Sequence, residues 1–266
     1  MYDPTSPLTA PPSRYRIESD SSDEEGEGAY PSSTRPSRPS PSAAVQIVLL
    51  PIDPANPNPL SATGAAVIGI GQAGKFLLRL VSGRPIFRVE VGNRPAGMGI
   101  AVDGGVVVAL QDGPAEAAAN IVTEVATTLK ASSWTLFSSY VPSMYIPQPG
   151  EEVPADPPVR VLSSMDVTGV GYDAPNYVTG LAGAFLSQAA HPAGAISSAT
   201  LYLLPLPLSQ LPNSALKPAL DALPPSLSKA LGRQAHWDED DDERFAGPGM
   251  GARMRESSRP EGGMYM

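Results

Sequence analysis

The chain has 266 residues, with 31 prolines, 25 glycines, no cysteine and a formal net charge of −9 at pH 7. The lack of cysteine excludes disulfides, thiolate catalysis and cysteine-based metal sites. The acidic balance argues against nucleic-acid binding, because a phosphate backbone needs a basic footprint. No run approaches 18 apolar residues and the start does not resemble a signal peptide, so we expect no membrane span and a cytoplasmic or nuclear location.

Residues 1–43 are predicted to form a disordered tail. The acidic run "SDSSDEEGEG" and the Pro/Ser-rich run "PSSTRPSRPSPS" offer little apolar surface to offset the entropy of ordering. Ser21 and Ser22 each precede a glutamate by three residues, which acid-directed kinases favour. The alternative is a tail that only keeps the protein soluble.

Residues 44–232 are predicted to form one α/β domain. Apolar, β-branched runs indicate buried strands, and apolar residues at helical spacing indicate helices. The expected strands lie at 44–51, 65–70, 85–92, in a hairpin turning at 103–105, and at 133–140, 159–164 and 195–207. The expected helices follow the second strand and lie at 114–130, at 176–190 with Asn176 as N-cap, and in pieces across 213–232. This alternation predicts three layers, with a mostly parallel central sheet between helices.

Two further segments are predicted to be irregular. Residues 141–158 hold several prolines and acidic residues, which is typical of a surface insertion. Residues 233–266 contain a run of six acidic residues near their start, Asp238 to Glu243, and continue with Gly, Pro and Arg. We expect this second segment to be a flexible tail of mixed charge.

The motif "GIGQAG" places Gly69, Gly71 and Gly74 in a G-x-G-x-x-G pattern between a strand and a helix. Glu90 follows at the end of the next strand, where a dinucleotide-binding fold has the carboxylate that holds a ribose. One hypothesis is therefore an NAD(P)-binding oxidoreductase. The short helix and the hairpin after the third strand argue against it. Glycines at a tight strand-to-helix turn also serve packing alone, and we expect no cofactor.

Catalytic patterns are sparse. His191 stands at a helix end before Pro192, and His236 falls in the expected tail. Asp166 and Asp173 are the carboxylates of a loop that could line the sheet edge or only cap the next helix. None of these residues belongs to a nucleophile, zinc or phosphate motif. We therefore expect no enzyme, and no catalytic or metal site.

The end of the sequence is unusual for a soluble tail. Met264, Tyr265 and Met266 form an apolar triplet after two glycines. Chance is one explanation. The other is capture of the triplet in a pocket that takes the aromatic ring and pairs with the α-carboxylate. About 33 flexible residues before it would give a root-mean-square reach of about 30 Å.

These parts together resemble the proteasome assembly chaperone family, and most closely the first subunit of its heterodimer in fungal form. The resemblance rests on "VIGIGQAGKFLLRLV", "WTLFSSY", "NYVTGLAGAFLSQAAHPAGAISSATLYLLP" and the terminal hydrophobic-Tyr-any triplet. It covers roughly residues 44–232 and the last three. The Pro-rich insertion at 141–158 and the break at Pro224–Pro225 depart from the family pattern.

The resemblance implies a function without catalysis. The chain would pair with a second, related chaperone subunit, and the heterodimer would cap the α-ring of the proteasome core particle. Met264, Tyr265 and Met266 would enter a pocket between adjacent α subunits, with the Met266 carboxylate forming an ion pair. The glycine turn at 69–74 would then be structural.

Overall fold

The computed structural model describes residues 45–49, 64–113, 115–152, 154–163, 167, 169–233 and 236–245. All of them belong to one compact unit, residues 41–266. The expected tail at 1–43, with Ser21 and Ser22, and the triplet at 264–266 lie outside the described residues. No helix in the described ranges is both long and apolar enough to cross a membrane.

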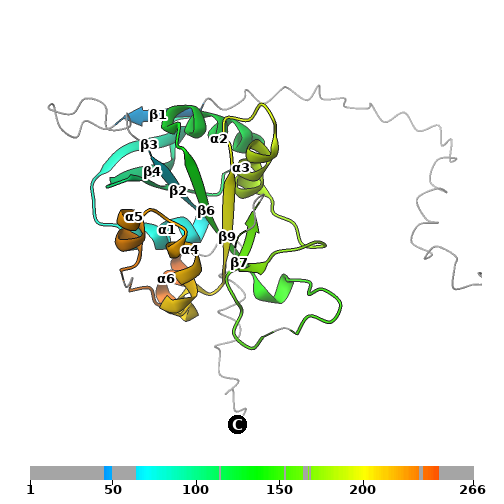
Figure 1. Ribbon diagram of the computed structural model, residues 1–266. Coiled ribbons are helices and arrows are strands. Elements are labelled where there is room, and N and C mark those ends of the chain that lie inside the picture. Colours follow the sequence, from blue (N-terminus) through cyan, green and yellow to red (C-terminus); the bar gives the residue numbers. More distant parts are fainter. Residues whose placement is uncertain are drawn as a thin grey trace, which may run out of the picture. The chain divides into compact units, whose positions relative to one another are not determined.

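Apart from the two-residue β8, the strands follow the predicted apolar runs closely. Figure 1 shows how they are arranged. They are β1 (Val45–Leu49), β2 (Ala65–Ile70), β3 (Pro85–Val91), β4 (Arg94–Val102), β5 (Gly105–Leu110), β6 (Ser133–Tyr140), β7 (Arg160–Ser163), β8 (Val170–Gly171) and β9 (Ala199–Pro205).

Helices connect these strands or follow them. The α-helices are α1 (Gly71–Leu80), α2 (Ala115–Leu129), α3 (Gly180–Ala190), α4 (Lys217–Asp221), α5 (Pro225–Leu231) and α6 (Glu239–Phe245). Short 3-10 helices are η3 (Pro142–Met144), η4 (Leu208–Gln210) and η5 (Asn213–Leu216).

Within the described residues, nine strands form one sheet in the order β1-β3-β4-β5-β2-β6-β9-β7-β8. The four central strands, β5, β2, β6 and β9, run parallel to one another. Antiparallel pairings join β1, β3 and β4 to β5 on one side, and β7 to β9 on the other. The predicted α/β class with a central sheet between helices is confirmed.

Strands β2 and β5 are covered on both faces, which explains why they are continuously apolar. In β2, Ala66, Ile68 and Ile70 point into one core cluster, and Ala65 and Val67 point into the other. Alternate residues of a strand face opposite sides of a sheet, so a strand between two helix layers needs apolar residues at every position.

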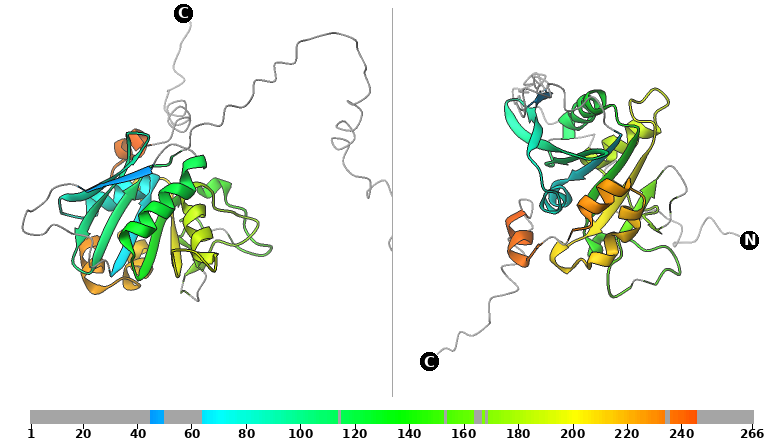
Figure 2. Two further views of the ribbon diagram at one scale, coloured as in Figure 1. Left: turned by 90° about the horizontal axis from the view of Figure 1, so that it is seen from above. Right: turned by 60° about the vertical axis from the view of Figure 1, so that its left-hand side comes forward.

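Two layers of helices cover the two faces of the sheet. Helices α2 and α3 pack on one face. Helix α1, the α4–α5 segment and Trp237 pack on the other. Figure 2 shows the helices on both sides of the sheet in two further views.

The prediction for the start of α3 is wrong. The helix begins at Gly180, with Thr179 at the N-cap position, and not after Asn176. The side chain of Asn176 instead bonds both backbone groups of Ile146, with distances of 2.9 and 2.8 Å. A residue suited to capping therefore joins two loops that are distant in sequence.

The prediction that a flexible tail begins at residue 233 is wrong for residues 236–245. Trp237 is buried, and α6 follows it directly. The acidic run is ordered because two of its carboxylates, Asp241 and Asp242, are buried and accept hydrogen bonds from Arg79 and from the backbone N–H of Leu208.

Candidate functional site

The glycine turn between β2 and α1 is closed by the protein itself. A side chain on Gly69 would come within 2.5 Å of the Gly74 Cα atom, and one on Gly74 would come within 2.6 Å of the Gly69 carbonyl oxygen. These two glycines therefore let the first turn of α1 lie directly against the end of β2. Gly71 has a positive φ of 61°, which suits glycine at this turn.

A carboxylate lies where a ligand phosphate would approach the turn. A side chain on Gly71 would meet Asp112 Oδ2 at 2.5 Å. Asp112 follows β5, which runs parallel to β2, so both strand ends reach the same edge of the sheet. Burial raises the pKa of the Asp112 carboxyl, and the nearby Lys75 ammonium opposes this rise. A carboxylate at this position repels a pyrophosphate.

Glu90 is far from the turn in the sheet. It lies on β3, and β4 and β5 separate β3 from β2. Its partner is Arg88, whose Nε atom is 2.6 Å from the Glu90 Oε1 atom. A dinucleotide-binding fold needs this carboxylate beside the glycine turn. The structure thus separates the two halves of the predicted nucleotide motif.

The other candidate catalytic residues are not brought together. Asp166 lies outside the described residues, and Asp173 is exposed. His236 is exposed, with Nε2 3.6 Å from an Asp238 carboxylate oxygen. Among the described residues, no group of His, Cys, Asp and Glu could hold a metal ion.

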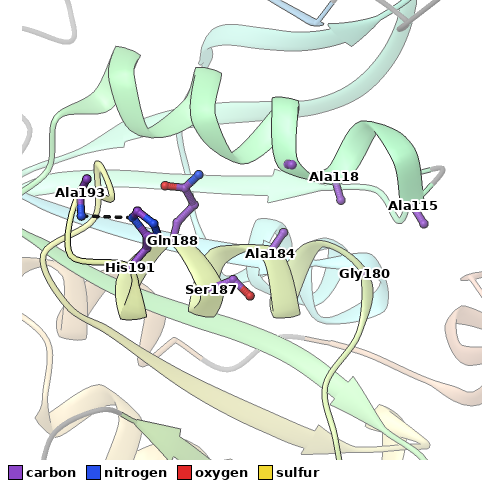
Figure 3. Close-up of a pocket in the computed structure, with 9 residues that line it drawn as sticks. Ala115, Ala118, Gly180, Ala184, Ser187, Gln188, His191 and Ala193 are labelled. Carbon is purple, nitrogen blue, oxygen red and sulfur yellow. Dashed lines mark hydrogen bonds between the residues drawn. The ribbon is translucent and has the colours of Figure 1, made fainter.

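His191 lines a hollow between α2 and α3 (Figure 3). Its Nδ1 atom accepts a hydrogen bond from the backbone N–H of Ala193 at 3.1 Å. The hollow has a volume of about 610 Å³. The described residues that line it are Ala115, Ala118, Ala119, Gly180, Ala184, Ser187, Gln188, His191 and Ala193. Among the described lining residues, none is a carboxylate that could pair with the imidazole.

A buried arginine organises the segment that was predicted to be a surface insertion. Arg160, in β7, lies under the ring of Tyr145, with Cζ 3.4 Å from the ring centroid. Its Nη2 atom donates to Glu151 Oε1 at 2.8 Å, and its Nη1 atom donates to the carbonyl oxygen of Gly171 at 2.8 Å. The arginine therefore joins the insertion to two strands at the edge of the sheet.

Three tyrosines surround this arginine, and we call the group the tyrosine cage: Tyr140, Tyr145, Tyr172 and Arg160. The ring centroids are 5.8 to 6.4 Å apart. Tyr140 donates to the Pro158 carbonyl oxygen at 2.7 Å. These contacts join Tyr145 and Glu151 of the insertion to β6 and β7.

The contacts of the cage favour opposite charges on Glu151 and Arg160. The hydrogen bond from Arg160, helped by the backbone N–H of Gln148, lowers the pKa of Glu151. Burial raises the pKa of Tyr145, and its hydrogen bond to Glu151 raises it further. At neutral pH the cage thus holds an ionised Glu151 against a charged Arg160, with the tyrosines neutral.

Helix α6 is fastened to α1 by an ion pair and an aromatic contact. Arg79 Nη1 donates to Asp241 Oδ2 at 2.6 Å and to the His236 carbonyl oxygen at 2.9 Å. Arg79 Nη2 also pairs with Asp241 Oδ1. The Trp237 ring packs edge-on against Phe76, with ring centroids 5.6 Å apart.

Asp242 adds a second attachment. Its carboxylate accepts the backbone N–H groups of Leu208 and Ser209 at 3.0 and 2.9 Å, and the indole N–H of Trp237 at 2.8 Å. The first backbone N–H groups of a helix have no acceptor within that helix. Asp242 supplies the acceptor for these groups in η4. The acidic run is held to the domain from residue 237 onward.

A local signal for α6 exists in the sequence. Asp238 and Asp241 form a reciprocal cap, since Asp241 N–H donates to Asp238 Oδ1 at 3.0 Å and Asp238 N–H points at Asp241 Oδ2 at 3.4 Å. A capping residue followed three positions later by an acceptor marks a helix start. The tryptophan just before it, in an otherwise acidic run, marks an apolar anchor.

Comparison with known proteins gives no family match. Neither a family model nor a curated protein matches the sequence.

Several solved structures are similar to the chain in part. PbaA of Pyrococcus furiosus, an archaeal homologue of proteasome-assembly chaperone, has 15% identity and a TM-score of 0.46, covering 80% of this chain and 89% of its own. A proteasome-assembly chaperone homologue of Mycobacterium tuberculosis has 16% identity and a TM-score of 0.36, covering 64% and 92%. A Corynebacterium glutamicum protein of unknown function has 11% identity and a TM-score of 0.41, covering 79% and 88%. TM-scores below 0.5 do not establish a shared function.

Proposed function

We propose that this chain is a non-enzymatic chaperone of proteasome core-particle assembly, and that it acts on the α-ring as one subunit of a heterodimer. The observation that carries the proposal is where the resembling segments fall in the fold. They are residues 67–81, 134–140 and 176–205, and they contain α1, α3 and β9 and most of β2 and β6. Because β2, β6 and β9 are neighbours in the sheet, the resembling segments form one continuous region at the centre of the domain.

The glycine turn supports a structural role within this proposal. Gly69 and Gly74 are used for contact between β2 and α1, and Asp112 lies against Gly71. The turn that motivated the oxidoreductase alternative is thus explained by packing.

We further propose that Met264, Tyr265 and Met266 dock in a pocket between adjacent α subunits. A three-residue contact contributes little affinity, in the range of micromolar or weaker dissociation constants. Avidity from the rest of the heterodimer raises the effective concentration of the triplet without a tight single contact. Weak single contacts also let the chaperone leave the finished ring.

The attachment of α6 shortens the expected tether. Phe245 is the last described residue, so 18 residues separate α6 from Met264. A flexible chain of this length has a root-mean-square reach of about 23 Å, against about 30 Å for the tether expected from sequence. The triplet would search a smaller volume around the end of α6.

The test is recovery of core-particle intermediates by a tagged, full-length chain in its native cell. We expect the wild-type chain to recover α subunits, and Tyr265→Ala or deletion of residues 264–266 to lower this recovery about tenfold, because the aromatic anchor is lost. Met254→Ala, in the same C-terminal segment, is the control and should recover them as the wild type does. Equal recovery by wild type and Tyr265→Ala would contradict docking by the triplet.

A further inference from the structure

Three large apolar side chains are exposed on two neighbouring segments next to the tyrosine cage. Met144 is 75% exposed, Ile146 54% and Tyr177 78%. The two segments that carry them are adjacent, because the Asn176 side chain bonds the backbone N–H and carbonyl of Ile146. A third hydrogen bond, from the Gln148 side-chain amide to the Ala174 carbonyl, joins the same two segments. We call Met144, Ile146 and Tyr177 the apolar ridge.

The ridge is held in place from below. Tyr145, between Met144 and Ile146, turns into the tyrosine cage and stacks on the buried guanidinium of Arg160. The Tyr145 hydroxyl donates to Glu151 at 3.0 Å, which ties the start of the insertion to its middle. A surface that is rigid before binding loses little conformational entropy when a partner covers it.

The exposed charges of the stretch that carries the ridge have one sign. Between residues 141 and 178, the described exposed charged residues are Glu152, Asp156 and Asp173, all acidic. The basic residue of this stretch, Arg160, is buried and paired with Glu151. Such a surface fits a protein that presents an apolar centre with lysine and arginine around it.

We infer that the apolar ridge binds the second chaperone subunit, which would present an apolar patch with a basic rim; this inference rests on the proposed function. The chain then has two kinds of contact. The rigid ridge suits a lasting association, because its geometry is fixed before binding. The triplet on its tether suits the contact with the α-ring, which must be released.

The experiment uses the full-length chain coexpressed with a tagged second subunit, and measures the dissociation constant of the purified pair. Ile146→Asp and Tyr177→Asp are the test variants, since a carboxylate in the apolar centre is left without a partner on binding. Met98→Asp, at an exposed methionine of β4, is the matched control. Circular dichroism and thermal unfolding of each free variant confirm that it is folded.

We expect Ile146→Asp and Tyr177→Asp to weaken the association at least about tenfold, and Met98→Asp to leave it unchanged. Asp156→Lys should weaken it less, with an effect that shrinks as salt rises.

If the wild-type pair forms and both ridge variants bind as the wild type does, the ridge assignment is overturned and the proposed function stands. If the wild-type pair does not form, the heterodimer itself is refuted. If the ridge variants instead abolish self-association of this chain, a second copy occupies the ridge, which also overturns the assignment.

Discussion

Two arginine–carboxylate pairs fasten the two segments that the sequence predicts to be irregular, and they do so differently. Arg160 holds the insertion and its side chain is only 3% exposed, whereas Arg79 holds α6 and its side chain is 36% exposed. Arg160 has a tyrosine ring, a carboxylate and a carbonyl as partners. Arg79 shares the attachment of α6 with the packed ring of Trp237 and with a second carboxylate, Asp242.

The two pairs differ in burial, and the loss of folding free energy on breaking an ion pair depends on that burial. A buried charge cannot be solvated when its surroundings change, so the cage depends on Arg160 itself. A partly exposed pair is screened by water, so α6 depends more on Trp237 and Asp242 than on Arg79. Four substitutions or conditions test this difference.

The largest effect is expected for Arg160→Ala. Removing the buried guanidinium leaves a void under Tyr145 and takes the donors from Glu151 and from the Gly171 carbonyl, so we expect the free energy of unfolding to fall by about 3 kcal/mol. Denaturant unfolding measures it. Arg84→Ala, at an exposed arginine, is the control and should change stability by less than about 0.5 kcal/mol. Equal midpoints for Arg160→Ala and the wild type would show that the cage is not a structural element.

Asp242→Ala is expected to come next. It leaves two backbone N–H groups and the Trp237 indole N–H without their acceptor, which should cost about 2 kcal/mol. Tryptophan fluorescence during denaturant unfolding reports on the site directly. Asp240→Ala, on the exposed side of the same helix, should have almost no effect. A loss as large for Asp240→Ala would mean that helix charge, and not the Asp242 contacts, holds α6.

Arg79→Ala is expected to have a smaller effect, about 1 kcal/mol, because the pair is partly exposed. The comparison is with Arg88→Ala, which breaks a more exposed pair with Glu90 on β3 and should cost less than about 0.5 kcal/mol. A double-mutant cycle of Arg79→Ala with Asp241→Ala isolates the coupling between the two side chains. Zero coupling would assign the attachment of α6 to Trp237 and Asp242 alone.

The smallest effect is a pH dependence from Glu151. Its pKa in the folded protein lies below the ordinary value near 4.5, because Arg160 donates to it. The ionised form therefore stabilises the fold above pH 4.5, and this contribution is lost as the pH falls through the lowered pKa. We expect the difference in melting temperature between wild type and Glu151→Gln to shrink between pH 7 and pH 3. A difference that grows on acidification would reverse the assigned sign.

The parts of the fold that could be predicted from sequence are those with local signals. The apolar run of β2 is predicted as a buried strand and that of β5 as one strand of a hairpin, and both are buried at every position. Helix α2 was predicted at 114–130 from its apolar spacing and is observed at Ala115–Leu129. Periodicity of 2.0 or 3.6 residues is a property of the segment alone, so no knowledge of the partner surface is needed.

The parts that could not be predicted depend on distant partners. Asp241 is 162 residues from Arg79, and Asn176 is 30 residues from Ile146. An acidic run and a cap-forming residue carry no local sign of such partners. The separation of Glu90 from the glycine turn has the same origin, since strand order, and not sequence distance, decides which residues meet.

The central claim is that the chain uses a rigid ridge for its partner subunit and its C-terminal triplet for the α-ring. The most direct measurement is quantitative mass spectrometry of both partners in one affinity purification of the wild type, Tyr265→Ala and Ile146→Asp. We predict that Tyr265→Ala keeps the second chaperone subunit and loses α subunits, and that Ile146→Asp loses the second subunit. Full retention of α subunits by Tyr265→Ala would contradict the account.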